Sequence, residues 1–571
     1  MESVKYKALK LTGETGKLAE NITDNWLMGI RESNPAIIDM FRDRDLLPYR
    51  DMLPWSGEFA GKYITGAAFV YKLTGRQDLY GYVTDFIDEL LTYQDGDGYI
   101  GCFSKQCRLS GAFSQSPEKT GETWDAWAHY HIMYGLVLWY DITGRRQYLA
   151  AAEKAAGLFI RKFYNGRPPL VSIGWSETNL AVYHVFGILY EKTKKPEYLD
   201  FARNIEKDLE SDEAGNYISN ALNGCEYYLT PKPRWESMHI IMGIAQMYRC
   251  TGEKKYLDAA CQIFYSILKT DVHNTGGFST DEQAMGNPYK NGAIETCCVV
   301  AYNALAIEIY KLTGDLRAAD FLERSHFNAV LGYCSPSGRW STYNTPMEGV
   351  KCANFHSIWF QCRPGSPELN CCSVNAPRGV ADLCEWLIRE TEDTVFLNFY
   401  ESMHVETESG FAADIKGDYP ACGRVDITVT ENRSGKKLAL RIPAWSKNTL
   451  VQTGKETYRP AAGEYFITDA PTGNITVTFD LTPYTEAGGG EYGGKCSIYA
   501  GPVLYAYDLA ANRDFDFDSI PPFPENELKT AVPIREKDGR ISLGFSNGVT
   551  LTNFGRAGDS GTPYKTWLSV E

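Results

Sequence analysis

The sequence predicts an α+β multidomain protein in which an all-helical toroid, a closed double ring of helices, is followed by an antiparallel β-sandwich. Three observations support this prediction. A chain of 571 residues is too long for one core. A turn motif recurs five times between segments of helical period, and the hydrophobic pattern changes to alternation after about residue 392. We therefore expect a helical domain over residues 1–391 and one or more sandwich domains over residues 392–571.

The helical part is marked by an internal repeat. The segments LTGRQDLY, ITGRRQYL, KTKKPEYL, CTGEKKYL and LTGDLRAA place a threonine at positions 74, 143, 193, 251 and 313. Each copy separates two apolar segments of helical period, which predicts a helix, a tight turn with a left-handed C-cap, and a second helix. Five such hairpins, with one more, close a ring, and the long insertions between them are expected to build a central pocket.

The β part is predicted from segments that alternate apolar and polar residues. TVFLNFY, GRVDITVTEN, KKLALRIPAW, NITVTFDL and CSIYAGPVLYAYD are rich in β-branched and aromatic residues and are separated by Gly, Pro and Asn. The glycine-rich stretch at 487–494 lacks the Lys-Ser/Thr of a phosphate-binding loop, so no nucleotide role is predicted.

Composition excludes two classes of partner. The formal net charge is -15 and no basic run stands out, so nucleic acid is not expected. No window approaches the roughly 20 apolar residues that span a membrane. The first ten residues contain no apolar segment, which fits a cytoplasmic protein or an exported one whose signal has been removed. Aromatic residues reach 13%, with 37 Tyr and 12 Trp, which suits carbohydrate sites because the C–H face of a sugar packs on a ring, although large helical and β-sandwich cores also use aromatic residues. The expected partner is an oligosaccharide or glycoside, and a homodimer is left open.

Eight of the 15 cysteines fall between Cys297 and Cys384. Two motifs, ETCC and NCCSVNAPRG, offer one carboxylate and three thiolates, the donor types that Zn²⁺ prefers: Glu295, Cys297, Cys371 and Cys372. One alternative is a set of reduced cysteines packed in a helical core. Another is a rearranged metal set drawn from Cys334, Cys352 and Cys362.

Acidic and aromatic residues near these motifs have two interpretations each. Asp281 and Glu282 form a carboxylate pair 13 residues before the ETCC glutamate, and such a pair is usually solvated. A catalytic role requires that its loop point into the toroid. Trp55 and Glu58 either line the pocket or cap the first hairpin.

Several motifs in order along the chain resemble the β-L-arabinofuranosidase family of glycoside hydrolases. They are WSGEFAGKY, QDGDGYIG, GGFSTDEQA, ETCC, LERSHFN, NCCSVNAPRG, RIPAW and GPVLY, and they extend from Trp55 to Tyr505. The resemblance implies an (α/α)6 barrel followed by β-sandwich domains. It also implies zinc held by Glu295, Cys297 and Cys372, with Cys371 as fourth ligand and nucleophile.

The same resemblance implies further roles. Glu282 matches the family's general acid/base, with Asp281 in reserve, and His131 and Glu323 fall where the family contacts sugar hydroxyls. The spacing from Glu282 to the metal-binding glutamate is shorter than in the family. A second sugar-contacting histidine is replaced near Asn179, and His239 does not align with the next one.

The expected activity is a retaining exo-glycosidase that releases L-arabinofuranose or a related sugar. A thiolate would take the place of the nucleophilic carboxylate usual in retaining glycosidases. Two alternatives remain open: another (α/α)6 enzyme, such as an unsaturated-uronide hydrolase or a lyase, and a carbohydrate-binding protein with a purely structural zinc.

Overall fold

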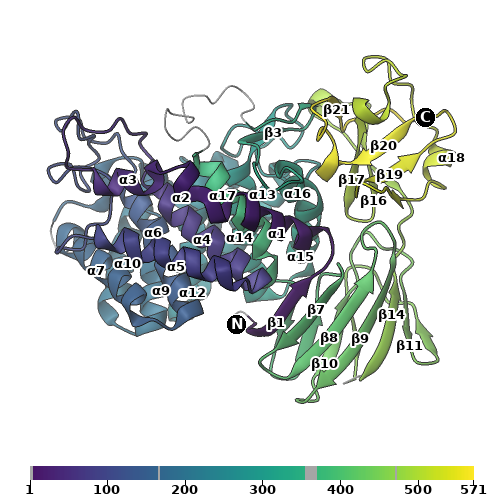
Figure 1. The fold of residues 1–571 in the computed structure, drawn as a ribbon, viewed down its shortest axis with the longest axis horizontal. Coiled ribbons are helices and arrows are strands. Elements are labelled where there is room, and N and C mark those ends of the chain that lie inside the picture. Colours follow the sequence, from purple (N-terminus) through teal and green to yellow (C-terminus); the bar gives the residue numbers. More distant parts are fainter. Residues whose placement is uncertain (1–3, 165–166, 354–368, 470–471, 571) are drawn as a thin grey trace.

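A computed structural model describes residues 4–164, 167–353, 369–469 and 472–570. The helical part forms one side of the molecule, and two separate β regions lie on the other (Figure 1). The described residues contain no helix long and apolar enough to cross a membrane.

Six helices form a closed inner ring. Each contacts the next in sequence, and the last returns to the first: α4 (Glu58–Thr74), α6 (Asp125–Thr143), α9 (Val182–Thr193), α12 (Met238–Thr251), α14 (Thr296–Thr313) and α17 (Cys371–Ala381). The outer partners are α5 (Gln77–Thr92), α7 (Arg146–Phe163), α10 (Pro196–Leu209), α13 (Lys254–Thr270), α15 (Leu316–Ser325) and α1 (Glu14–Asn25). The predicted double ring is confirmed, and its sixth pair joins α17 to α1 from the beginning of the chain.

The repeated threonine ends five inner helices in the same way. Its hydroxyl donates to the carbonyl four residues back at 2.7–2.8 Å and accepts the N–H two residues ahead at 3.1–3.4 Å. The residue after it is left-handed in all five copies, a glycine in four and Lys194 (φ 57°) in the third. Five of the six inner helices end at this turn, so the turns mark the C-terminal ends of these helices, and the two ends of the ring differ chemically.

The first β region is a two-sheet sandwich. One sheet has the order β1-β7-β8-β9-β14-β11-β12 and the other β13-β10-β6-β5. Their bounds are β1 (Tyr6–Leu11), β5 (Ile388–Glu390), β6 (Thr394–Leu397), β7 (Met403–Thr407), β8 (Phe411–Gly417), β9 (Arg424–Asn432), β10 (Lys437–Arg441), β11 (Leu450–Thr453), β12 (Glu456–Tyr458), β13 (Tyr465–Thr468) and β14 (Gly473–Thr478). Pairing is antiparallel as predicted, apart from the parallel pair β6–β10.

A second β region follows from residue 484. Its strands are β15 (Tyr484–Ala487), β16 (Cys496–Ala500), β17 (Val503–Asp508), β18 (Ile534–Arg535), β19 (Ile541–Gly544), β20 (Thr550–Asn553) and β21 (Pro563–Lys565). The range 1–391 is not purely helical, because β1 pairs with β7 of the sandwich and β4 (Gly349–Val350) pairs with β21. Both β regions are therefore joined to the helical ring by strand pairing.

The remaining elements are short. They are α2 (Ile30–Ser33), α3 (Ala36–Arg42), α8 (Ser176–Asn179), α11 (Tyr217–Leu222), α16 (Leu331–Tyr333), α18 (Glu525–Leu528), β2 (Ala293–Glu295) and β3 (Asn344–Pro346). Of these, β2 and β3 pair with each other and lead directly into the candidate site.

Candidate metal centre and active site

The four predicted metal ligands meet at the starts of two inner helices. Glu295 ends β2, Cys297 lies in the first turn of α14, and Cys371 and Cys372 open α17. The cap of α17 is Asn370, whose side chain accepts the N–H of Cys372 at 3.0 Å. Helix N-termini favour negative charge, so both helices support thiolates at this end of the ring.

The spacing of the four donor atoms fits a tetrahedral metal. All four side chains are buried and their ligand atoms lie within 4.8 Å of one another. The Sγ of Cys372 is 3.6 Å from the Sγ of Cys297 and 3.7 Å from that of Cys371. Bonds of about 2.3 Å at tetrahedral angles place two sulfurs about 3.8 Å apart, whereas a disulfide needs about 2.05 Å. The cluster is therefore a candidate metal centre and not a disulfide.

The carboxylate completes the set. Its Oε1 lies 3.4 Å from the Sγ of Cys372 and 3.8 Å from that of Cys371. Burial, together with the charges of Glu282 and Cys297, raises the pKa of Glu295 well above its usual range. A divalent cation among these donors would remove that repulsion, because it favours the ionised form of each one.

A lysine that the sequence analysis did not single out lies next to the cluster of Glu295 and the three cysteines. The Nζ of Lys62 is 3.7 Å from the Sγ of Cys297 and 3.0 Å from Glu58 Oε1. It also lies over the rings of Trp127 and Trp235. Although burial alone lowers the pKa of Lys62, the charges of Cys297 and Glu58 raise it above its usual value. Its position four residues after Glu58 on α4 was the available sequence signal.

Glu58 is buried beside Lys62, in the first turn of α4. Besides Lys62, it accepts a hydrogen bond from the indole N–H of Trp127. Burial raises the pKa of Glu58 to about 7. This carboxylate and the lysine form a buried charge pair that reaches one thiolate.

The loop carrying the predicted acid/base turns toward the cluster. Glu282 has left-handed backbone (φ 61°), and its Oε2 is 3.0 Å from Arg234 Nη2. Its charge contributes to the raised pKa of Glu295, and its side chain is 41% exposed. Asp281 instead pairs with Lys290 at 2.6 Å. Glu282 is thus a half-exposed carboxylate beside a buried metal set.

A second carboxylate in this region was missed by sequence reasoning. Glu236 is buried, and its Oε1 is 2.8 Å from Arg234 Nη2. Burial raises the pKa of Glu236, and its charge also acts on Glu295. Glu236 and Glu282 share one arginine, so the guanidinium fixes the position of both carboxylates.

Tryptophan rings lead from the surface toward the cluster. The rings of Trp55 and Trp124 are 5.1 Å apart, and Trp124 is 5.4 Å from Trp175, which is 39% exposed. Trp124 also contacts Trp127, the neighbour of Lys62. Such aromatic faces are suited to the C–H faces of sugars.

The buried histidines lie beside these rings. His131 is 4.4 Å from Trp127 and 5.2 Å from His239, measured between ring centroids. The Nε2 atoms of both histidines are buried without a hydrogen-bond partner among the described residues. Burial lowers the pKa of His131 well below its usual value, so the ring is neutral. The amide of Asn179 holds the carbonyl oxygens of Thr123 and Gly174.

The structure does not bring Glu323 to the cluster. This residue is fully buried on α15, where its Oε1 is 2.6 Å from Arg441 Nη2 of the sandwich. Tyr419 and the indole N–H of Trp445 also donate to it. These contacts give Glu323 the position of an anchor between the ring and the sandwich, and the sugar contact implied by the resemblance has no support in this geometry.

The alternative metal set can be followed for two of its three cysteines. Cys334 is buried and Cys352 is exposed, and Cys362 lies outside the described residues. Among the residues that the structure describes, the glutamate and three cysteines named above are the group of candidate ligands that converges.

The double ring of helices, the buried group of one glutamate and three cysteines, and the β-sandwich occur together in a class of carbohydrate-active enzymes whose family models match this chain. Residues 32–385 match the family model for the GH127 β-L-arabinofuranosidase catalytic domain, and residues 394–481 match the GH127 middle domain. The chain belongs to this family of glycoside hydrolases. No protein with a curated description matches it.

Solved structures share the fold over the whole chain. A GH127 β-arabinofuranosidase superposes with a TM-score of 0.79 at 19% identity, covering 100% of this chain and 98% of the other. A GH127 β-L-arabinofuranosidase from Geobacillus stearothermophilus T6 gives 0.77 at 16% identity, covering 99% and 100%. A third structure, described as a glycoside hydrolase, gives 0.76 at 17%, covering 100% and 97%.

Proposed function

We propose that this glycoside hydrolase is a retaining exo-enzyme that releases L-arabinofuranose or a related sugar, with Cys371 as nucleophile and Glu282 as general acid/base. The observation that carries the proposal is the placement of Cys371 among the metal donors, with a half-exposed carboxylate on the adjoining loop. Retaining glycosidases need one nucleophile and one proton donor flanking the scissile bond. Exo-action is proposed from the pocket that a toroid of helices normally makes.

In this scheme Cys371 is the nucleophile, and Glu282 acts first as the acid and then as the base. Glu282 protonates the departing glycosidic oxygen while the Cys371 sulfur attacks the anomeric carbon, forming a thioglycosyl bond and breaking the glycosidic bond. Glu282, now ionised, takes a proton from water, which attacks the same carbon and releases the sugar with the thiolate restored. Arg234 holds the Glu282 carboxylate at 3.0 Å, so that carboxylate is positioned before substrate arrives.

We further propose zinc as the metal. Three thiolates and a carboxylate match its preferred donors, and Glu295, Cys297, Cys371 and Cys372 would hold it. Bound zinc would keep the coordinated thiols deprotonated at neutral pH. The Cys371 thiol donates a hydrogen bond to the hydroxyl of Tyr343, 3.3 Å from its sulfur, so Tyr343 would help to position the nucleophile.

The substrate would be a glycan or glycoside end that fits between the tryptophans and the neutral histidines. The Nε2 atoms of His131 and His239 are buried without a hydrogen-bond partner among the described residues, and a sugar hydroxyl that reached them would supply one. Trp55 and Trp175 offer ring faces nearer the surface. A carbohydrate-binding protein with a structural metal would have no need of Glu282 beside the cluster.

The test compares release of p-nitrophenol from furanosides and pyranosides, led by the β-L-arabinofuranoside, by wild type, Cys371→Ala and Glu282→Gln under reducing conditions. We expect turnover of one sugar by wild type and at least a thousandfold loss in Cys371→Ala. Glu282→Gln should lose less on this activated leaving group than on an alkyl glycoside. Full activity in Cys371→Ala would eliminate the proposed nucleophile, and elemental analysis finding no zinc would eliminate the proposed metal.

A further inference from the structure

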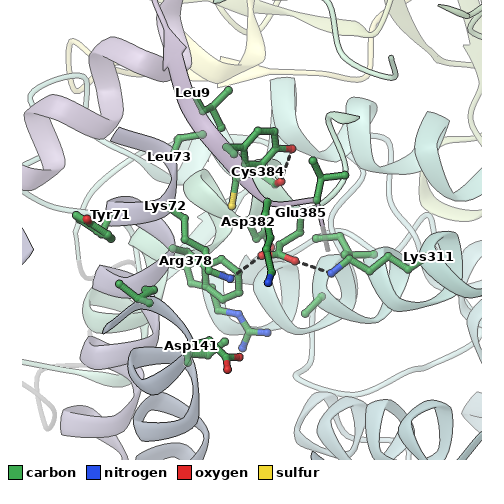
Figure 2. A pocket seen from close by; sticks show the side chains of 18 of the residues that line it. Leu9, Tyr71, Lys72, Leu73, Asp141, Lys311, Arg378, Asp382, Cys384 and Glu385 are labelled. Carbon is green, nitrogen blue, oxygen red and sulfur yellow. Dashed lines mark hydrogen bonds and ion pairs between the residues drawn. The ribbon is translucent and has the colours of Figure 1, made fainter. Parts of the chain in front are cut away.

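A cavity of 1920 Å³ lies at the end of the helical ring opposite the thiolate cluster (Figure 2). Thr74, Gly75 and Gly252 from the repeated turns line it, so it is at the C-terminal ends of the inner helices, while the thiolates are at N-terminal ends. Strand β1 and the beginning of α1 cover part of it. The proposed reaction makes no use of this cavity.

The net formal charge of the residues that line the cavity is positive, whereas that of the whole protein is negative. Nine basic and seven acidic residues line the cavity, whereas the whole chain has 57 Lys and Arg against 72 Asp and Glu. A chamber with excess positive charge inside an acidic protein favours anions over cations.

Most basic side chains in the deep part of the cavity have carboxylate partners. Lys72 and Lys311 both pair with Glu385, at 2.9 and 2.5 Å, as the dashed lines in Figure 2 show. Arg249 pairs with Glu308 at 2.7 Å. These cations also lie in last helical turns, where they compensate the helix dipoles, so they need no ligand.

Arg378 is different. Its side chain is 3% exposed and its guanidinium lies over the rings of Phe69 and Tyr134, at 5.7 and 5.6 Å. The Nε is buried without a partner, and within the described parts of the chain the guanidinium makes no hydrogen bond or ion pair of 4.0 Å or less. Arg378 lines the cavity, with these two rings packed against its guanidinium. A buried charge without a partner is costly.

The adjacent acidic residue does not supply the missing charge. Asp382 follows Arg378 by one turn, and its Oδ2 is also buried without a partner. Burial raises the pKa of Asp382 to about 8, so this carboxyl is largely protonated at neutral pH and can donate a hydrogen bond.

We propose that this cavity binds a small oxyanion, a carboxylate- or phosphate-bearing molecule, whose oxygens pair with the guanidinium of Arg378. The planar N–H fork of arginine matches two oxygens of either group. Lys72 of α4 and Lys311 of α14, the inner helices on either side of α17, line the same space and add positive charge around the ligand (Figure 2). This site is independent of the glycosidase chemistry at the other end of the ring.

Isothermal titration calorimetry on the full chain tests the proposal with inorganic phosphate, citrate and glucuronate as separate probes, which distinguishes phosphate from carboxylate ligands. We expect at least one probe to bind with a Kd below 1 mM. Arg378→Gln should weaken it at least tenfold. The matched control, Arg203→Gln, removes a half-exposed arginine of α10 that pairs with Glu253, and should leave binding unchanged. Absence of binding by all three probes, or equal binding by Arg378→Gln, overturns the proposal.

A crystallographic measurement keeps the proposal testable if Arg378→Gln does not fold. Crystals of wild type soaked in selenate should show anomalous density within hydrogen-bond distance of the Arg378 guanidinium. Selenate density only elsewhere, or none, overturns the proposal.

Discussion

Replacing Glu323 by alanine should destabilise the protein without impairing the chemistry of the folded enzyme. Glu323 and Arg441 are both fully buried, and their ion pair of 2.6 Å joins the ring to the sandwich. Breaking a buried pair from one side costs about 3–5 kcal/mol. Arg441 keeps Asp320 as a second partner, whereas Tyr419 and Trp445 lose their acceptor. We therefore expect a loss near the lower limit, about 3 kcal/mol.

Urea denaturation followed by tryptophan fluorescence measures this loss, with kcat and KM determined on the folded fraction. Glu406→Ala is the control, because Glu406 forms a surface pair of 3.3 Å with Lys7, worth less than about 1 kcal/mol. A loss below about 1 kcal/mol in Glu323→Ala would refute the anchor interpretation. So would normal stability with a raised KM, which is the result expected of a residue that contacts sugar.

Three further predictions concern packing, pH and the lysine behind the cluster. Gly61→Ala should lower stability by about 1–3 kcal/mol, because the new Cβ would lie 2.3 Å from the backbone of His131. Gly81→Ala, which has open space around it, should instead stabilise the protein by up to about 1 kcal/mol. Thermal denaturation of both variants checks this, and equal effects would contradict it. Burial raises the pKa of Glu401 to about 7, so the folded state holds this proton more tightly than the unfolded state, and stability falls as the pH rises from about 4.5 to 7. Glu401→Gln should remove up to about 3 kcal/mol of this fall in a profile of urea midpoints against pH. An unchanged profile would show that Glu401 does not cause the fall. Lys62→Met should weaken metal retention against a chelator at least tenfold, since it removes the cation 3.7 Å from the Sγ of Cys297. Retention equal to that of wild type would mean that Lys62 only balances the charge of Glu58.

Local patterns in the sequence predicted the elements well. The repeated threonine and the residue after it specify a helix end by themselves, since the hydroxyl, the N–H two residues ahead and the left-handed residue are all within one turn. Alternation predicted the strands for the same reason, because side chains in a strand point to opposite faces every second residue. The cysteine motifs also predicted the ligand set, since donor type identifies a candidate metal site without knowledge of the fold.

What the pattern could not predict was which distant residues meet. Glu236 and Arg234 lie beside Glu282 because two separate loops of the ring converge. Strand β1 pairs with β7, almost 400 residues away, and so the helical range contributes to the sandwich.

The difference between local pattern and long-range contact also explains the roles of Glu323 and Arg378. The sequence alone determined that both are charged residues on helices. Only the tertiary structure decided that one meets Arg441 across a domain boundary while the other, within the described residues, is buried without an ion pair. A charge's role depends on burial and on its nearest partners, and both are set by packing between segments that the sequence does not place side by side.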